Sequence, residues 1–400
     1  MTSQLEFVSV SNSEEAQRLR FILNQCFNFP LSDSLSYWQS LGTENFRAVR
    51  QSGQLLGGLV IYQMGQWFGS QQLPMAGIAA VGVAPEYRGT GVVTELLRHT
   101  LRELYANGAA LSVLYAATQR PYRKVGYEQA GNYCAFKLAA ESINLDLGEE
   151  YLKKIRSIPM RSVVPISHEV FHDIYRQKAI QNNGNLERNR AIWERLVQPR
   201  KEEVMYAYLV GSETQPQGYI IFNQKQEGQQ LQLVIKDWVA LTPAAGRRLW
   251  MFLGDHRSII KEVLWHGSAI DPFLSLLSEQ TYKIIRLERW LLRILDVPKA
   301  LSKRGYPVGV EAELHLKVRD NLLPENNGNF LLAVSGGQGE VTRGGRGELQ
   351  LDVRGLAPLY TGLFTPYQLQ VTGQLEGSEK ALSVASQLFA GSEPWMSDFF

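Results

Sequence analysis

The sequence has few cysteines and little net charge, and each of these facts excludes some kinds of protein. It contains two cysteines in 400 residues, Cys26 and Cys134, whose separation fits neither a metal-binding pair nor a redox pair. Two cysteines cannot build a disulfide framework in a chain of this length, so we expect a protein of the reducing cytoplasm. The formal net charge is only +2. A field this weak does not steer a protein to nucleic acid or to a membrane surface, and we expect neither as a partner.

Long apolar runs are also missing. The opening residues have neither the basic segment nor the apolar segment of a secretory signal, so none is expected. No stretch reaches ~18 apolar residues without a charge, which argues against a membrane-spanning helix. What remains is the composition of a globular protein, 44% hydrophobic and 20% charged. At roughly 100–200 residues per domain, the length predicts two or three domains.

The first of these, residues 1–145, has the pattern of a mixed α/β domain. A helix is predicted to begin at Asn12, which has a capping side chain and is followed by acids in the first turn. A second helix is predicted over 90–106, where apolar residues recur at helical spacing, and a short helix carries Tyr122. Strands are predicted at 4–10, 45–50, 54–66, 72–84, 110–117 and 131–138.

A weaker copy of the same pattern follows in residues 146–289. Ile192–Leu196 echoes Tyr37–Leu41, and Gly218–Phe222 echoes Gly58–Tyr62, at a nearly constant offset. Repetition at a fixed offset is the signature of a duplicated structural unit. We therefore predict a second domain with the fold of the first.

Residues 290–400 differ from both copies. Apolar residues alternate with polar ones between 310 and 318, which is typical of a half-buried strand. Further strands are predicted near 329–334, 340–343 and 347–353, separated by glycine turns, and helices near 296–303 and 378–389. This pattern predicts a separate α+β domain.

The most informative segment is the turn between strand 72–84 and helix 90–106. It consists of Arg88, Gly89, Thr90 and Gly91. Glycines let a backbone approach a ligand closely, and the first N–H groups of a helix attract anions. The turn lacks the Lys-Ser/Thr pair of a P-loop and the third glycine of the dinucleotide fingerprint. We predict that this turn binds the pyrophosphate of a ligand. The alternative is that the turn is a plain loop without a ligand.

A second motif, Tyr122–Tyr127, follows after one helix and one strand. The two motifs together resemble the GCN5-related N-acetyltransferase superfamily, whose acyl-CoA signature is Arg/Gln-x-x-Gly-x-Gly/Ala. Arg88 and Gly91 match that signature, whereas Val93 replaces its final small residue. The whole chain resembles the enhanced intracellular survival (Eis) branch, which has an active acetyltransferase domain, a degenerate second copy and a sterol-carrier-like C-terminal domain. In the second copy Pro243–Gly246 replaces the turn, so no coenzyme A is expected there.

The resemblance implies acetyl-CoA as co-substrate and no metal. A thioester is already activated toward amines, so catalysis needs positioning, a polarised carbonyl and a protonated leaving thiolate. Tyr122, a phenol that is protonated at neutral pH, is predicted to supply that proton. In the resembled family the C-terminal carboxylate is proposed as the base, and this chain ends in an aromatic residue, Phe400. The residues expected to hold acetyl-CoA are Val81, Gly82, Val83, Arg88, Gly89, Thr90, Gly91, Val92 and Val93.

For the acceptor, the resemblance implies a primary amine of a small molecule or a peptide, such as an aminoglycoside, a polyamine or a lysine. Trp38 matches a tryptophan of the family's acceptor pocket. Asn28 stands where relatives can carry an acid, and the missing charge would weaken the attraction for polycations. The resemblance also implies a homo-oligomer, a hexamer, and a third domain that delivers the C-terminus.

Two other functions compete with this one. A lipid-binding or sensory protein would hold coenzyme A only as a structural ligand. A zinc hydrolase would use His168–His172, which matches the HExxH pattern, but we interpret this segment as a surface helix capped by Ser167. Arg343–Gly347 resembles an RNA-binding RGG box, but it lies between predicted strands and is interpreted as a hairpin turn.

Overall fold

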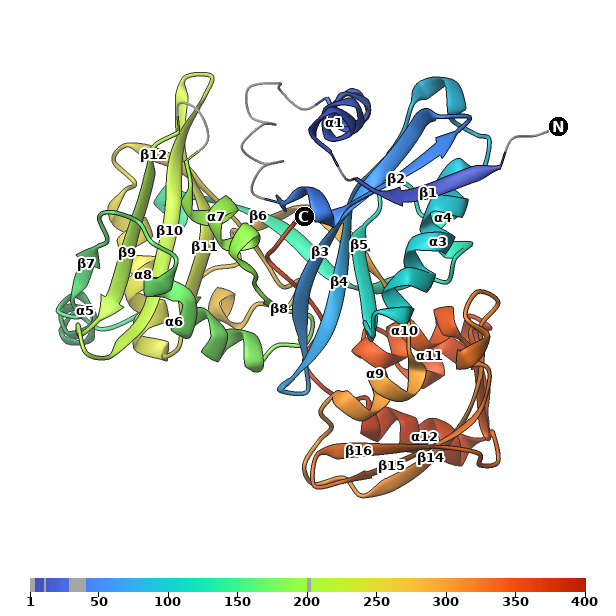
Figure 1. Cartoon of the computed structure of the whole chain (residues 1–400). Coiled ribbons are helices and arrows are strands. Elements are labelled where there is room, and N and C mark those ends of the chain that lie inside the picture. Colours follow the sequence, from blue (N-terminus) through green and yellow to red (C-terminus); the bar gives the residue numbers. More distant parts are fainter. Residues whose placement is uncertain (1–3, 11, 29–40, 200–202) are drawn as a thin grey trace. The chain divides into compact units, whose positions relative to one another are not determined.

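The computed structural model describes residues 4–10, 12–28, 41–199 and 203–400, which form two compact units (Figure 1). Unit 1 contains Met1–Gly131, Arg289–Pro394 and Phe399–Phe400. Unit 2 contains Asn132–Glu288 and Trp395–Asp398. The chain therefore leaves unit 1 for unit 2, and its last two residues belong to unit 1 again.

The first sheet of unit 1 is a mixed sheet in which one pair of strands is parallel. β4 and β5 are parallel, and the other neighbouring strands are antiparallel. Trp290–Ile294 pairs with β5, a position that the sequence pattern did not predict. In order across the sheet, the strands are β1 (Leu5–Ser9), β2 (Phe46–Gln51), β3 (Gln54–Phe68), β4 (Gln71–Val83), β5 (Leu111–Tyr115) and β13 (Lys283–Ile294).

Helices cover both faces of this sheet (Figure 1). The predicted cap of the first helix is confirmed, because the Asn12 side chain accepts a hydrogen bond from the Glu15 N–H at 2.8 Å. This helix packs on Gly58 and Gly82, where any Cβ would lie within 3.0 Å of its leucine side chains. Glycine at both positions therefore lets the helix approach the sheet. The helices are α1 (Ser13–Phe27) on one face and α3 (Val92–Ala106) with the short α4 (Arg120–Arg123) on the other.

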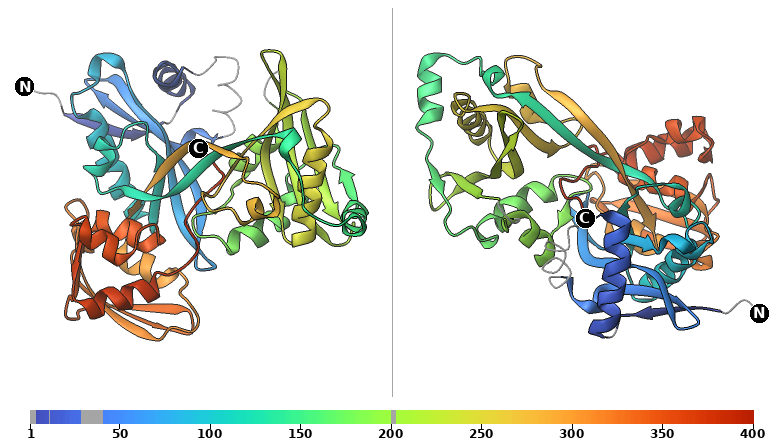
Figure 2. Two further views of the ribbon diagram at one scale, coloured as in Figure 1. Left: turned by 180° about the vertical axis from the view of Figure 1, so that it is seen from behind. Right: turned by 90° about the horizontal axis from the view of Figure 1, so that it is seen from above.

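The rest of unit 1 is an α+β domain, in which helices cover one face of a five-stranded sheet with the order β16-β15-β14-β17-β18 (Figure 2). The sequence pattern predicted two of its helices and four of its strands, but not α10, α11 or β18. The elements are α9 (Val297–Lys303), β14 (Ala312–Arg319), β15 (Gly328–Ser335), β16 (Gln338–Arg343), β17 (Leu349–Asp352), α10 (Val353–Thr361), α11 (Pro366–Val371), β18 (Leu375–Gly377) and α12 (Glu379–Leu388).

The interpretation of Arg343–Gly347 as a hairpin turn is wrong. β16 pairs with β15, whereas β17 pairs in parallel with β14, so this segment crosses between strands that are not neighbours. Gly345 has φ 95°, and a Cβ there would lie 2.6 Å from His315 Nδ1. The Arg346 N–H donates to that same nitrogen at 3.2 Å. Gly345 therefore lets this segment cross close to His315. Strand spacing alone does not distinguish such a crossing from a hairpin turn.

Unit 2 repeats the arrangement of the first domain. The antiparallel pair β10–β11 is followed by α8 and then by β12, which is parallel to β11, as β3–β4 is followed by α3 and β5. Among the residues described, no helix is long and apolar enough to cross a membrane. The elements are β6 (Glu128–Ala139), which begins in unit 1 and enters unit 2 at Asn132, α5 (Glu149–Arg156), β7 (Met160–Ser162), α6 (Glu169–Ile180), β8 (Leu186–Glu187), α7 (Arg190–Val197), β9 (Met205–Gly211), β10 (Pro216–Glu227), β11 (Gln230–Ala240), α8 (Pro243–Asp255) and β12 (Ile260–Gly267).

The segment that matches HExxH forms the start of α6, but its predicted cap is wrong. The N-cap residue is His168 rather than Ser167, and its own backbone is already helical. His168 and His172 both face the ring of Trp193, at centroid distances of 6.1 and 6.3 Å. Within the described ranges, no three histidine, cysteine or acidic side chains gather into a group that could hold a metal ion.

Candidate functional site

β4 is interrupted by a bulge in the segment predicted to contact a thioester. Its register against β3 shifts beside Ala80, which has φ 50°. On its other edge, β4 pairs with β5 only over Met75–Gly77. The Ala84 N–H bonds to β3, and main-chain groups of successive residues point to opposite edges of a strand. Val81 and Val83 therefore present their main-chain groups to the edge away from β3.

The turn after β4 owes its shape to two glycines in the left-handed region. Gly89 has φ 81° and Gly91 has φ 91°, conformations that are strained for residues with a side chain. A Cβ at either position would meet no heavy atom within 4 Å, so the space in front of the turn is open. Arg88 and Thr90 are exposed, and the Thr90 hydroxyl donates to the Tyr87 carbonyl at 2.7 Å, which closes the turn.

The N-terminus of α3 begins directly at this turn. Its N-cap is Gly91, and no side chain in the described part of the molecule caps it. The Thr94 and Glu95 N–H groups return to the Gly91 carbonyl at 2.9 and 3.2 Å. The N–H groups of Val92 and Val93 precede the first helical hydrogen bond and point along the axis, where the helix dipole favours an anion.

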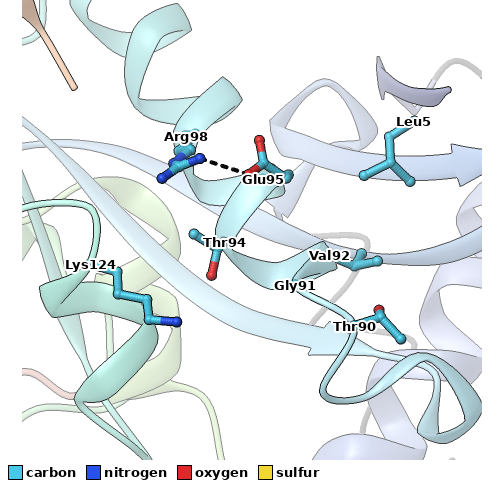
Figure 3. A pocket seen from close by; sticks show the side chains of 8 residues that line it. All are labelled: Leu5, Thr90, Gly91, Val92, Thr94, Glu95, Arg98 and Lys124. Atoms are coloured by element: carbon cyan, nitrogen blue, oxygen red, sulfur yellow. Dashed lines mark hydrogen bonds and ion pairs between the residues drawn. The ribbon is translucent and has the colours of Figure 1, made fainter. Parts of the chain in front are cut away.

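A cavity of about 430 Å³ opens at this end of the helix (Figure 3). Lys124 extends into it from the end of α4, and Arg98 forms an ion pair with Glu95 at 2.8 Å (Figure 3). A diphosphate fits this arrangement, because helix amides and a lysine ammonium meet at the same open space. The lining residues are Leu5, Thr90, Gly91, Val92, Thr94, Glu95, Arg98 and Lys124.

Two basic residues of this cavity, Arg98 and Lys124, were missed by sequence reasoning. A signal for Lys124 existed, because it lies within the Tyr122–Tyr127 motif and carries the charge that a diphosphate needs. Among the residues predicted to hold acetyl-CoA, Gly82 has a structural reason to be a glycine. A Cβ at Gly82 would lie 2.6 Å from Leu23 of α1, so this glycine allows helix packing.

Tyr122 lies in an apolar core to which β4 and α3 both contribute residues. Its side chain is 8% exposed and belongs to the same apolar cluster as Val83 and Val92. Burial raises the pKa of the Tyr122 phenol to about 12. The group is therefore neutral at physiological pH and can donate a proton.

The neighbouring phenol of Tyr127 is committed to the fold. Its ring packs edge-on against Tyr122 at 6.0 Å, and its hydroxyl lies 2.6 Å from Ser112 Oγ. Ser112 donates its own proton to the Ala76 carbonyl at 3.0 Å, so Tyr127 is the donor in the Tyr127–Ser112 bond. The Tyr127 hydroxyl is thus already engaged with Ser112.

The last residue of the chain is buried within unit 1. Phe400 is 7% exposed, and its ring centroid lies 5.8 Å from Tyr62 and 6.0 Å from Tyr115. Phe399 stacks on Tyr115 at 4.4 Å. A Cβ at Gly77 would lie 2.6 Å from the Phe400 ring, so this ring fits only against a glycine of β4. The terminal carboxylate is attached to a residue that is fixed beside the central strand.

The residues just before Phe399 are held within unit 2 by a buried arginine. The Arg188 side chain is fully buried and donates to Asp398 at 2.9 Å, to Asp237 at 2.5 Å and to the Ser397 hydroxyl at 3.1 Å. Two carboxylates compensate the cost of burying this guanidinium.

Of the two residues predicted to contact the acceptor, Asn28 lies within the described residues and Trp38 does not. Asn28 ends α1 in the left-handed conformation, with φ 52° and ψ 40°, and its N–H bonds to the Asn24 carbonyl. Asparagine tolerates this conformation better than most residues, so a structural reason for Asn28 exists.

The counterpart of α3 in unit 2 begins differently. The Thr242 hydroxyl accepts a hydrogen bond from the Ala245 N–H at 3.1 Å and so caps α8 with a side chain. Phe273 covers Gly246, where a Cβ would lie 2.6 Å from its ring. Main-chain groups that stand open in α3 are thus capped or covered in α8.

Three family models match the chain. An acetyltransferase (GNAT) domain matches residues 8–130, a second acetyltransferase (GNAT) domain matches 184–294, and a sterol carrier protein domain matches 297–397. The two acetyltransferase matches agree with the duplication seen in the sequence and in the strand order.

Solved structures and a curated relative that resemble this chain are also N-acetyltransferases. A GCN5-related N-acetyltransferase from Anabaena variabilis is 48% identical, with 99% of this chain and 100% of that chain covered and a TM-score of 0.95. Another from Kribbella flavida is 28% identical, with 100% and 99% covered and a TM-score of 0.84. The N-acetyltransferase Eis of Mycobacterium tuberculosis is 25% identical over 332 residues, which are 78% of this chain and 77% of that protein.

The substitution Gly77→Ala tests whether the Phe400 ring packs against Gly77. The new Cβ would lie 2.6 Å from the Phe400 ring, and overpacking of this kind costs about 1–3 kcal/mol. We expect carboxypeptidase Y to release Phe400 at least about fivefold faster than from the wild type. Gly148→Ala is the matched control, because a Cβ there meets no atom within 4 Å. Equal release from both variants would show that the ring does not rest on Gly77.

Proposed function

We propose that this chain, which belongs to the GCN5-related N-acetyltransferases and to their Eis-like branch, transfers the acetyl group of acetyl-CoA to a primary amine. It is an acyl-CoA-dependent N-acetyltransferase with tandem acetyltransferase domains and a sterol-carrier domain. The open start of α3, facing a cavity that contains Lys124, carries the proposal. We assign the active domain to residues 1–145, the degenerate copy to 146–289 and the sterol-carrier-like domain to 290–400.

Binding rests on main-chain groups. Acetyl-CoA supplies the acetyl group as a thioester that amines can attack directly. The N–H groups of Val92 and Val93, with Lys124, would hold the diphosphate, because an anion is favoured at a helix start. Val81 and Val83, at the edge of β4 away from β3, would hold the pantetheine arm and polarise the acetyl carbonyl.

The transfer requires one proton to leave and one to arrive. The amine nitrogen bonds to the acetyl carbon while the carbon–sulfur bond breaks, so the nitrogen loses a proton and the sulfur gains one. Tyr122 would donate to the sulfur, since its phenol is neutral at physiological pH. The Phe400 carboxylate, which is ionised at neutral pH, would accept the proton from the nitrogen.

The acceptor would be a primary amine of a small molecule or a peptide. The Phe400 ring lies beside the rings of Tyr62 and Tyr115, and an ammonium group would be attracted both by aromatic faces and by the Phe400 carboxylate. Asn28 in place of an acid argues for acceptors with fewer charges than an aminoglycoside. By family resemblance we further propose a homo-hexamer in the cytoplasm.

Calorimetry with coenzyme A and an amine panel test the function itself. We expect one coenzyme A per chain, because α3 is open and α8 is capped, and amine-dependent release of free thiol from acetyl-CoA. The panel should contain polyamines, lysine peptides, aminoglycosides and simple monoamines. No coenzyme A binding would overturn the enzyme. Binding without thiol release, together with a co-purifying lipid, would instead support the lipid-binding alternative.

The proton donor is tested with Tyr122→Phe. General acid catalysis contributes about 10²–10⁴-fold, so we expect kcat to fall by that order while coenzyme A affinity in calorimetry stays unchanged. Tyr105→Phe, on α3, is the control for removing a phenol elsewhere in the same domain and should keep its activity. A Tyr122→Phe enzyme with full kcat would remove this residue from the mechanism.

The role of the C-terminal carboxylate is tested by semisynthesis. Replacing it with a carboxamide keeps the shape of Phe400 but removes the negative charge. We expect a loss in kcat of about 10²-fold or more, with KM for acetyl-CoA unchanged. The control is the same ligation with a free carboxylate. Equal kcat values for the two products would show that another group accepts the proton.

A further inference from the structure

Glu128 is a buried carboxylate that joins α4 to the sterol-carrier domain within unit 1. It is 4% exposed and opens β6. One oxygen accepts from the Arg123 guanidinium at 3.0 and 2.6 Å, and also from the Gln129 N–H at 3.1 Å. The other oxygen accepts from the Arg354 guanidinium at 3.2 and 2.6 Å. Two arginines from distant parts of the sequence thus hold the two oxygens of one carboxylate.

The helix that carries Tyr122 is too short to fix its own position. α4 has four residues, Arg120–Arg123, which form about one turn, and isolated helices need ~12–15 residues to be even marginally stable in water. It is followed by Gly126, with φ 93°. Contacts from outside the helix must therefore determine where the Tyr122 side chain lies, and Arg123 is its immediate neighbour.

The sterol-carrier domain supplies several of these contacts. Leu322 and Leu323 belong to the same apolar cluster as Tyr122. Val353 lies 3.1 Å from the place that a Cβ on Gly126 would take. Arg354, the next residue along α10, bonds to Glu128. This domain therefore forms part of the wall against which α4 rests.

From this geometry we infer that Glu128 is a positioning residue for Tyr122, and that the sterol-carrier domain, through Arg354, keeps the proton donor in place. The inference rests on the proposed role of Tyr122. It gives the third domain a task in the acetyl transfer that needs no bound lipid and is separate from the placement of the C-terminus.

The charge state of Glu128 is consistent with a bridge that is intact at physiological pH. Burial raises its pKa, but hydrogen bonds from Arg354 and Arg123 outweigh burial and lower it overall. A carboxyl with a lowered folded pKa stabilises the protein above its unfolded pKa of ~4.3 and loses this effect as the pH falls through the folded value. The Glu128 bridge is therefore fully formed at neutral pH.

The test is Glu128→Gln, which keeps the size of the side chain but turns an NH₂ group toward one of the arginines. We expect kcat to fall about tenfold, since a ~1 Å misplacement of a catalytic group can cost ~10²-fold. The affinity for coenzyme A should fall less than kcat, because the start of α3 keeps its contacts whereas Lys124, like Tyr122, is carried by α4. In a Tyr122→Phe background the same substitution should have no further effect on kcat, because its route of action has been removed.

Arg354→Met gives a second reading, in case Glu128→Gln does not fold. Its side chain is 40% exposed, so the loss of stability is smaller, and kcat should fall in the same direction. Arg346→Met is the matched control, because it removes an arginine of the same domain that pairs with Glu348 at the surface, and it should keep the wild-type kcat.

Three results would overturn the inference. Unchanged kcat in both Glu128→Gln and Arg354→Met would show that the bridge does not affect the reaction. An equal fold loss in the Tyr122→Phe background would show that Glu128 acts independently of the tyrosine. A fully active Tyr122→Phe enzyme would overturn the positioning role together with the proposed acid, while thiol release by the wild type would leave the acetyltransferase function standing.

Discussion

The first main-chain amides of α3 have no acceptor in the helix itself, and the turn before the helix leaves the space in front of them open. Gly89 and Gly91 adopt conformations that keep side chains away from the front of the helix. Thr90 closes the turn with its hydroxyl instead of capping α3, so the amides stay open. The counterpart helix shows the alternative, because Thr242 caps α8 with its side chain and an ordinary helix start results.

Burial of Tyr122 has two consequences that act on each other. It raises the pKa of the phenol to about 12, so the group is neutral at physiological pH, as an exposed phenol also would be. It also requires a core around a helix of one turn, and that core is completed by residues of the sterol-carrier domain such as Leu322 and Leu323. A free first domain would lack this wall. The acetyltransferase fold and the third domain are thus physically one unit, although they are far apart in sequence and match separate family models.

Local patterns predicted local structure well and long-range contacts poorly. The cap at Asn12 and the helices at 90–106 and 378–389 follow from caps and periodicity, which act within a few residues. The interpretation of Arg343–Gly347 failed because two strands that are consecutive in sequence are not neighbours in the sheet. Lys124 was overlooked although it lies within the Tyr122–Tyr127 motif, because only the cavity that it shares with α3 shows what its charge can do. The Glu128 bridge depends on Arg354, which is more than 200 residues away in sequence.

The last residues of the chain are held in two ways. Asp398 takes part in a buried ion pair within unit 2, and Phe399 and Phe400 make aromatic contacts within unit 1. Burying Arg188 is unfavourable by itself, and it becomes tolerable because Asp237 and Asp398 both bond to it. A surface ion pair would place Asp398 less firmly, because exposed pairs contribute little and hold flexible side chains. Within unit 1, Phe399 stacks on Tyr115 and the Phe400 ring fits where Gly77 of β4 has no side chain. Within unit 2, this buried ion-pair cluster is kept although the start of α8 is capped by Thr242.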